Sequence, residues 1–358
     1  TSHTLSSQWT LNLNAFYVRG AGYYEQYKDN AKLSNYLLPP AIVGNDTITR
    51  SDLIRQRWLD NHYYGTTFSL DYNSFKKLNF SFGGGWNQFD NDHYGKVIWA
   101  RFASTSETGY RYYFGKGLKS DLNLYAKAYY QLSPAFNVYG DLQYRQVGYT
   151  VDGTDNDLNE LKVDTWMGFW NPKVGINYDI EDKGSVYASF SVGNREPNRN
   201  DFVDAQAGHI PTHETLYDWE AGYRLRHNKV VFNANLYFMD YRNQLVLTGQ
   251  LNDVGSAIRV NVPKSYRAGI ELEAAWAISK QLKWNANITF SRNKISRFTE
   301  YVFNYDTYDH DVIDHGQTDI SFSPNTVAGS QLNYSFGGGF EVALLTKLVG
   351  KQYLDNTS

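Results

Sequence analysis

The chain of 358 residues contains no cysteine, only 2 methionines and 8 prolines, and no apolar run near the ~20 residues of a membrane helix. The absence of cysteine excludes disulfide frameworks, cysteine-ligated zinc and thiol nucleophiles. A formal net charge of −3 gives no overall electrostatic reason to expect nucleic acid as a partner. Hydropathy alone predicts a soluble protein, but it cannot detect membrane barrels, whose strands average an apolar and a polar face.

Aromatic residues are abundant, with 30 Tyr, 20 Phe and 9 Trp, and many segments alternate strictly between apolar and polar residues. In residues 282–291 the apolar positions are Leu282, Trp284, Ala286, Ile288 and Phe290. Because successive side chains of a strand point to opposite faces, this segment predicts a strand with one apolar and one polar face. The pattern indicates about thirteen strands, clearest at residues 9–17, 64–72, 122–130, 136–144, 174–180, 230–238, 268–276 and 340–344.

The connections between these strands alternate between short turns and long polar loops. The short turns are at 73–77, 132–135, 181–184, 226–229, 277–281 and 335–339, and the long loops are at 20–52, 88–118, 148–168, 195–213, 244–264 and 294–317. This rhythm is typical of an antiparallel up-and-down transmembrane β-barrel, an all-β fold with its long loops on the extracellular rim. The polar face is rich in Asn, Ser, Thr, Gly and Tyr, as in a water-filled or plugged lumen, so we expect the apolar face to meet lipid.

One part of the chain is more specific. Residues 186–202, VYASFSVGNREPNRNDF, and the following 211–246 resemble the late barrel region of TonB-dependent outer-membrane receptors, in a form most similar to receptors of Bacteroidetes. The matching positions are Arg195 to Pro197, Pro211, Glu214, Glu220 to Gly222, and Tyr241 to Asn243. The resemblance implies a barrel of 22 strands with an N-terminal plug. Since about thirteen strands are visible and both ends look cut, we expect residues 1–358 to form a single, partial barrel domain, from the interior to the C-terminal part, without the plug and final strands.

The resemblance also implies a function, namely active import of a scarce nutrient across the outer membrane of a Gram-negative bacterium. The TonB complex would act through the missing plug, and no enzymatic step or cofactor is expected. An iron complex, a siderophore or haem, is the first expectation because the loops contain many Tyr and His. Cobalamin, or a glycan or peptide imported with a surface lipoprotein, comes next. A passive porin-type channel, or an outer-membrane or secreted β-rich enzyme or binding protein, is the alternative.

The loops supply the candidate ligand-binding residues. Residues 300–316 combine phenols, carboxylates and imidazoles that suit ferric iron or Ca²⁺, but their spacing matches no established metal motif, and a solvated acidic loop is the simpler interpretation. Residues 194–201 form either a lumen wall that pairs with the plug or an anionic ligand, or an internal salt-bridge network at a strand end. His209 is a possible haem or metal ligand, or an ordinary loop residue. The full set is Arg195, Glu196, Arg199, Asp201, His209, Tyr301, Tyr305, Tyr308, Asp309, His310 and His315, with no metal site predicted.

Overall fold

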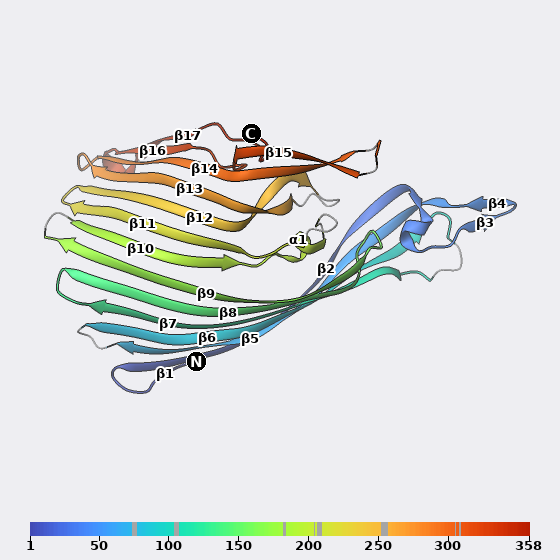
Figure 1. Cartoon of the computed structure of the whole chain (residues 1–358), viewed down its shortest axis with the longest axis horizontal. Coiled ribbons are helices and arrows are strands. Elements are labelled where there is room, and N and C mark those ends of the chain that lie inside the picture. Colours follow the sequence, from blue (N-terminus) through green and yellow to red (C-terminus); the bar gives the residue numbers. More distant parts are fainter. Residues whose placement is uncertain are drawn as a thin grey trace. The chain divides into compact units, whose positions relative to one another are not determined.

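A computed structural model describes residues 1–73, 77–103, 107–181, 184–203, 205, 210–251, 257–304, 306–307 and 309–358, with the backbone alone at 249–251, 257, 303, 309 and 310. Almost all of this chain is antiparallel β-strand (Figure 1). It divides into two compact units. Unit 1 consists of residues 1–70, 82–124 and 144–168, and unit 2 of residues 71–81, 125–143 and 169–358.

The strands follow one another in the sheet in the order of the sequence. The described strands are β1 (Ser2–Thr4), β2 (Trp9–Lys32), β3 (Ala41–Val43), β4 (Asp46–Ile48), β5 (Arg50–Asn73), β6 (Leu78–Ala100), β7 (Tyr110–Gln131), β8 (Phe136–Thr154), β9 (Glu160–Ile180), β10 (Gly184–Arg195), β11 (Glu214–His227), β12 (Val230–Leu251), β13 (Ala257–Ala277), β14 (Leu282–Asn304), β15 (Asp309–Asp319), β16 (Thr326–Ser335) and β17 (Glu341–Val349). The helices of this part are η1 (Leu33–Tyr36), α1 (Arg199–Val203) and η2 (Gly337–Gly339). None of them is long and apolar enough to cross a membrane.

The hydrogen-bonded order is that of an up-and-down meander. It runs β1-β2-β5 and then through consecutive strands to β14, β16 and β17, while β15 pairs with β14 alone and β3 pairs with β4 in a separate hairpin. Four strands of the described part do not count as separate crossings, namely the three-residue β1, the β3–β4 hairpin and β15, which pairs with β14 alone. The other thirteen follow one another in the sheet, which confirms the expected number. The order has two ends, β1 and β17, and is therefore that of an unclosed sheet.

The strands are longer than the alternation predicted, and most of the segments predicted as long loops are strand instead. β2 and β5 each have 24 residues and β14 has 23, so the ranges 20–52, 88–118, 148–168, 244–264 and 294–317 are largely strand. A tilted strand needs only ~10 residues to cross the apolar layer. Beyond that layer both faces of a hairpin meet water, so the alternation fades although the backbone pairing continues.

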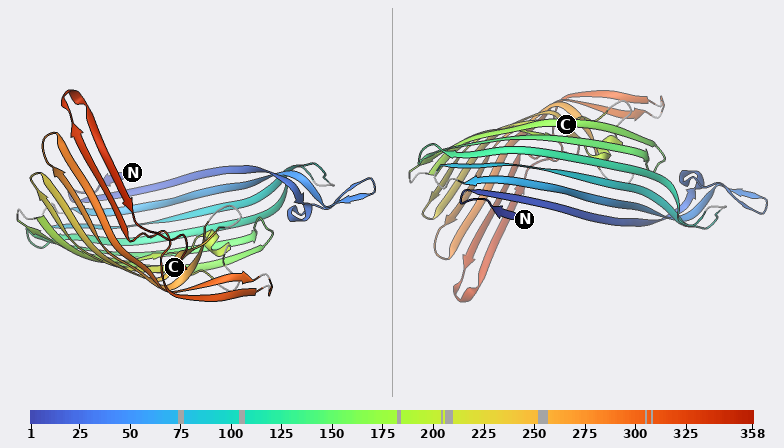
Figure 2. Two further views of the ribbon diagram at one scale, coloured as in Figure 1. Left: turned by 90° about the horizontal axis from the view of Figure 1, so that it is seen from above. Right: turned by 90° about the horizontal axis from the view of Figure 1, so that it is seen from below.

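In unit 2 the register places the apolar and polar residues on opposite faces. Leu272 lies opposite Ile288, which lies opposite Ala328 on its other side. One residue along, Glu273 lies opposite Asn287, which lies opposite Gly329. The same division extends over β9 to β17, and large apolar side chains remain exposed on the apolar face, among them Leu236 at 56% and Leu344 at 62%. Figure 2 shows β10 to β14 side by side in this order.

Two tyrosines on the polar face of unit 2 lie against glycines of the neighbouring strand. Tyr187 of β10 is opposite Gly222 of β11, and a Cβ at Gly222 would lie 2.5 Å from the Tyr187 ring. Tyr237 of β12 is opposite Gly269 of β13, where a Cβ would lie 2.6 Å from the phenol oxygen. The Tyr187 hydroxyl donates to Asn235 Oδ1 at 2.8 Å. The absence of a side chain at each glycine therefore makes room for a ring that lies over the sheet.

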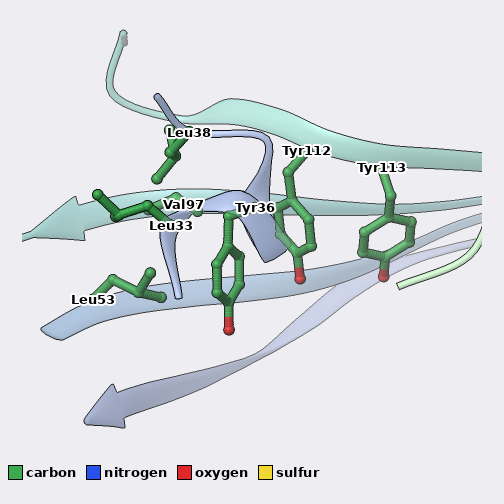
Figure 3. Packing of buried hydrophobic residues seen from close by; sticks show 7 residues of the cluster. All are labelled: Leu33, Tyr36, Leu38, Leu53, Val97, Tyr112 and Tyr113. Atoms are coloured by element: carbon green, nitrogen blue, oxygen red, sulfur yellow. The ribbon is translucent and has the colours of Figure 1, made fainter. Parts of the chain in front are cut away.

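Unit 1 contains a compact apolar cluster around η1, the short helix that follows β2 (Figure 3). Leu33, Leu53 and Tyr112 are 1%, 0% and 1% exposed. The rings of Tyr36 and Tyr112 meet edge to face with centroids 4.9 Å apart. The connection between β2 and β5 is thus anchored by its own core, as is typical of compact loops that hold a fixed shape.

Candidate functional site

Unit 2 contains a cavity of about 280 Å³ that three of the predicted loop regions line together. The lining residues are Ala205, Ile210 and Pro211 from 195–213, Arg259 to Pro263 from 244–264, and Arg297, Thr299 and Tyr301 from 294–317. The regions 195–213 and 294–317 therefore lie at the same end of their strands, as the alternation of short and long connections predicted. Two guanidinium groups, one phenol and the amide of Asn261 give the cavity its polar chemistry.

Arg259 is held by a buried carboxylate. Its Nη1 lies 3.4 Å from Oδ1 of Asp201, whose side chain is only 4% exposed. Asp201 also accepts a hydrogen bond from the backbone N–H of Asn198 at 2.8 Å, and Asn198 Oδ1 accepts from the N–H of Asp201 at 3.0 Å. Asp201 therefore fixes both the start of α1 and the position of Arg259, because charge-assisted hydrogen bonds are strong and directional.

Arg297 of β14 also lines the cavity. Its Nη2 lies 2.6 Å from Oδ2 of Asp314, with side chains 73% and 44% exposed. The hydrogen bond from Arg297 and the N–H of Gly316 lower the pKa of the Asp314 carboxyl below its ordinary value. The pair is therefore ionised at neutral pH. Because Nε and Nη2 both donate to Asp314, Nη1 is the guanidinium nitrogen that would contact an anion.

Asn261 ties the 210–213 segment to the wall of the cavity. Its Oδ1 accepts from the N–H of Thr212 at 2.8 Å, and its Nδ2 donates to the carbonyls of Thr212 at 2.9 Å and Asn243 at 2.7 Å. Sequence reasoning missed Asn261, Arg259 and Arg297. They belong to no motif, and the one available signal was the presence of basic residues in regions expected at the extracellular rim.

Arg195 and Asp201 lie in paired, structural positions rather than in the cavity lining. Arg195 Nε lies 2.9 Å from Oε1 of Glu214, directly across the β10–β11 pair, and Glu214 also accepts from the N–H of Leu245 at 2.9 Å. Arg195 and Asp201 thus form salt bridges with Glu214 and Arg259, which lie outside 194–201, rather than with charged residues of the same segment. Glu196 is half-buried, and Arg199 has a buried Nε without a hydrogen-bond partner in the described part of the chain.

The predicted loop 300–316 is a hairpin of β14 and β15. His315 Nε2 lies 2.8 Å from Oε2 of Glu300, with the Phe298 ring 6.1 Å away, and Asn304 bonds Asp311 at 3.0 Å. Tyr301 alone of the predicted tyrosines is placed, and it lines the cavity. His209, Tyr305 and Tyr308 lie outside the described residues, as do the side chains of Asp309 and His310. The residues that are described contain no group of three or more acidic or histidine side chains suited to a metal.

Solved structures show the same fold. The siderophore receptor PiuA from Acinetobacter baumannii is 13% identical with a TM-score of 0.68, over 99% of this chain and 54% of that one. The ferric-catecholate import receptor Fiu from E. coli K12 is 14% identical with a TM-score of 0.62, over 98% and 53%. The copper transporter OprC is 12% identical with a TM-score of 0.66, over 96% and 50%. This chain thus spans about half the length of these structures.

No curated protein sequence matches the chain. The model of the family described as TonB dependent receptor-like, beta-barrel, in contrast, matches residues 1–358, the whole length. The members of this family are transporters and receptors rather than enzymes, and their barrels lie in the outer membrane of Gram-negative bacteria. The chain belongs to the TonB-dependent receptor β-barrels.

Proposed function

We propose that the protein imports an anionic iron complex, a siderophore in the first instance, by TonB-dependent transport. The observation that supports this most directly is the cavity of Arg259, Arg297 and Tyr301, which lies at one end of β13 and β14 beside the 195–213 connection. Membership of the family supports the mode of transport. The TonB complex would act on a plug inside the barrel, and the wall described above would serve as the scaffold.

The chemistry of the cavity favours an anionic ligand with flat oxygen-bearing groups. A guanidinium donates two parallel hydrogen bonds to a carboxylate or a catecholate, and a phenol can donate a third. At about 280 Å³ the cavity is near the lower limit of the ~300–1,000 Å³ of small-molecule pockets. It would therefore hold one arm of a siderophore, while other groups complete the site.

The remaining candidate residues are proposed as that surrounding surface. His315 lies in the same hairpin as Tyr301, and Arg199 is on the helix whose Asp201 holds Arg259. Arg195 and Glu196 lie at the end of β10, next to this helix in the sequence. His209, Tyr305, Tyr308, Asp309 and His310 are proposed with them on the grounds of sequence position alone.

Arg297→Ala in the full-length receptor tests the proposal. Loss of a charge-assisted hydrogen bond costs about 1.5–3 kcal/mol, so affinity for the ferric complex should fall about 10- to 150-fold. Binding of ferric citrate and of a ferric tris-catecholate is measured by quenching of protein fluorescence, and uptake by iron-55 accumulation in iron-limited cells. Arg292→Ala is the matched control, because Arg292 is an exposed arginine of the same strand and does not line the cavity.

Arg259→Lys extends the test, because lysine keeps the charge beside Asp201 but loses the planar donor pair. We expect a smaller loss of affinity and a normally folded barrel. If both variants bind both ferric probes as the parent does, the cavity is not the binding site. If the parent binds neither probe but binds cyanocobalamin, the iron assignment is wrong.

A further inference from the structure

One face of unit 1 contains a row of aromatic rings with cations placed on them. The rings of Tyr23 and Trp58 have centroids 4.4 Å apart, and those of Trp58 and Tyr94 are 5.9 Å apart and almost parallel, at 7°. These three residues come from β2, β5 and β6. Lys96 Nζ lies 5.0 Å from the Trp58 ring and 5.4 Å from the Tyr94 ring, and the Arg111 guanidinium lies 4.0 Å from the Tyr94 centroid. We call Tyr23, Trp58, Tyr94, Lys96 and Arg111 the aromatic row.

The aromatic row lies on the same face of the strands as the apolar rings expected to meet lipid. Trp58 is an even-numbered residue of β5, as are Tyr64 and Phe68 further along that strand. On β6, Tyr94 shares its face with Trp86 and Phe82 by the same alternation. The rings of Tyr64 and Trp86 are 5.9 Å apart and those of Phe68 and Phe82 are 5.8 Å apart, so this face is continuous with the apolar surface.

Ion pairs separate the aromatic row from these apolar rings. Arg19 Nη2 lies 3.3 Å from Oδ2 of Asp60, and Lys116 Nζ lies 3.1 Å from Oδ1 of Asp90. Along β6, Asp90 and Asp92 lie between Trp86 and Tyr94. Along β5, Asp60 lies between Tyr64 and Trp58. Lys96 and Arg111 lie beyond them, where the contacts found for their charged ends are with aromatic rings.

The height of the row identifies the layer that it meets. Tyr94 follows Trp86 by eight residues, which corresponds to about 20 Å along the membrane normal at ~3.3 Å per residue and a tilt of ~40°. The polar headgroup layer of an ordinary phospholipid leaflet is only about 5–8 Å thick. If the Trp86 ring lies at the edge of the hydrocarbon, as aromatic girdles do, the aromatic row lies above any phospholipid headgroup.

We propose that the aromatic row binds the headgroup of a phosphorylated glycolipid in the outer leaflet of the membrane. Its sugar rings would lie on Tyr23, which is 51% exposed, and on Phe114, which is 38% exposed and 6.0 Å from the Arg111 guanidinium, while Tyr94, at 7%, is covered by its neighbours. Its phosphates would pair with Lys96 and Arg111, which are positioned by cation–π contacts before the lipid arrives. The occupant is a glycolipid because this height requires a headgroup built of sugars.

The test measures lipid binding to the full-length receptor in detergent by native mass spectrometry. The probes are rough-type lipopolysaccharide, the same lipopolysaccharide with its phosphates removed enzymatically, and phosphatidylglycerol. For the double variant Lys96→Gln, Arg111→Gln we expect about tenfold weaker binding of intact lipopolysaccharide. We expect the unsubstituted receptor to bind the dephosphorylated lipopolysaccharide about tenfold more weakly than the intact one. Phosphatidylglycerol should bind the unsubstituted receptor and the double variant equally.

Matched controls lie on the opposite face of the same strands. Tyr63→Ala removes a ring from β5, and Lys119→Gln removes a cation from β7, and neither should change lipopolysaccharide binding. Equal binding by the double variant and the parent overturns the proposal, as does indifference of the parent to removal of the phosphates. A parallel loss of phosphatidylglycerol binding overturns the glycolipid assignment. The dephosphorylated probe needs no variant, so the proposal stays testable if the double variant does not fold.

Discussion

Replacing Ile288 by arginine tests which face of the sheet meets lipid. Ile288 lies six residues into β14 from the short 277–281 turn, or about 15 Å along the membrane normal at ~3.3 Å per residue and a tilt of ~40°. An apolar band is about 25 Å tall, so this position is close to its middle. An arginine there costs about 2–4 kcal/mol, which is a ~30- to ~1,000-fold loss in the folding equilibrium.

The neighbouring substitution Asn287→Arg is the matched control. Asn287 lies on the polar face, between Glu273 and Gly329. The glycine leaves space for the longer side chain, and the glutamate supplies an opposite charge, so we expect a change within about 0.5 kcal/mol. The free energy of unfolding of the full-length receptor is measured in phospholipid vesicles by tryptophan fluorescence against guanidinium. If arginine lowers the free energy of unfolding equally at positions 287 and 288, the assignment of the apolar face to lipid is refuted.

Three further perturbations follow from the packing. Gly222→Ala places a methyl group 2.5 Å from the Tyr187 ring and should cost about 1–3 kcal/mol in the same assay, whereas Gly193→Ala, with no atom within 4 Å, should cost no more than a few tenths. Leu53→Ala opens a cavity in a fully buried position and should cost about 2–5 kcal/mol in local stability, seen as faster hydrogen exchange around η1. Deletion of 300–316 should weaken uptake of the ferric complex while the receptor remains folded in the membrane; undiminished uptake would show that the hairpin has no part in binding.

The division of the sheet into two faces could be predicted from the sequence because it follows from local alternation. The pairs Leu272 with Ile288 and Glu273 with Asn287 needed no long-range information beyond the register. The number of strands was equally accessible, since each strand is separated from the next by a recognisable turn or polar segment.

The cavity could not be predicted in this way, because it depends on contacts between distant segments. Arg259 and Asp201 are 58 residues apart, and nothing near either residue indicates the other. Glu214 belongs to the segment that resembles the family, but its pairing with Arg195 depends on the β10–β11 register. The outer ends of the strands were predicted as loops because water on both faces removes the alternation that marks a strand.

The two tyrosine–glycine contacts have a consequence for how the sheet selects its pairing during assembly. A slip of two residues between neighbouring strands keeps apolar side chains with apolar ones and polar with polar, so alternation cannot exclude it. A slip of that kind would place Tyr187 opposite Glu220 or Arg224 instead of Gly222, and Tyr237 opposite Arg267 or Glu271 instead of Gly269. Each ring would then meet a side chain at the place where it now contacts a glycine, which has none. The glycines therefore favour the observed register of β10 with β11 and of β12 with β13, because a register shifted by two residues would bring each tyrosine ring against a side chain.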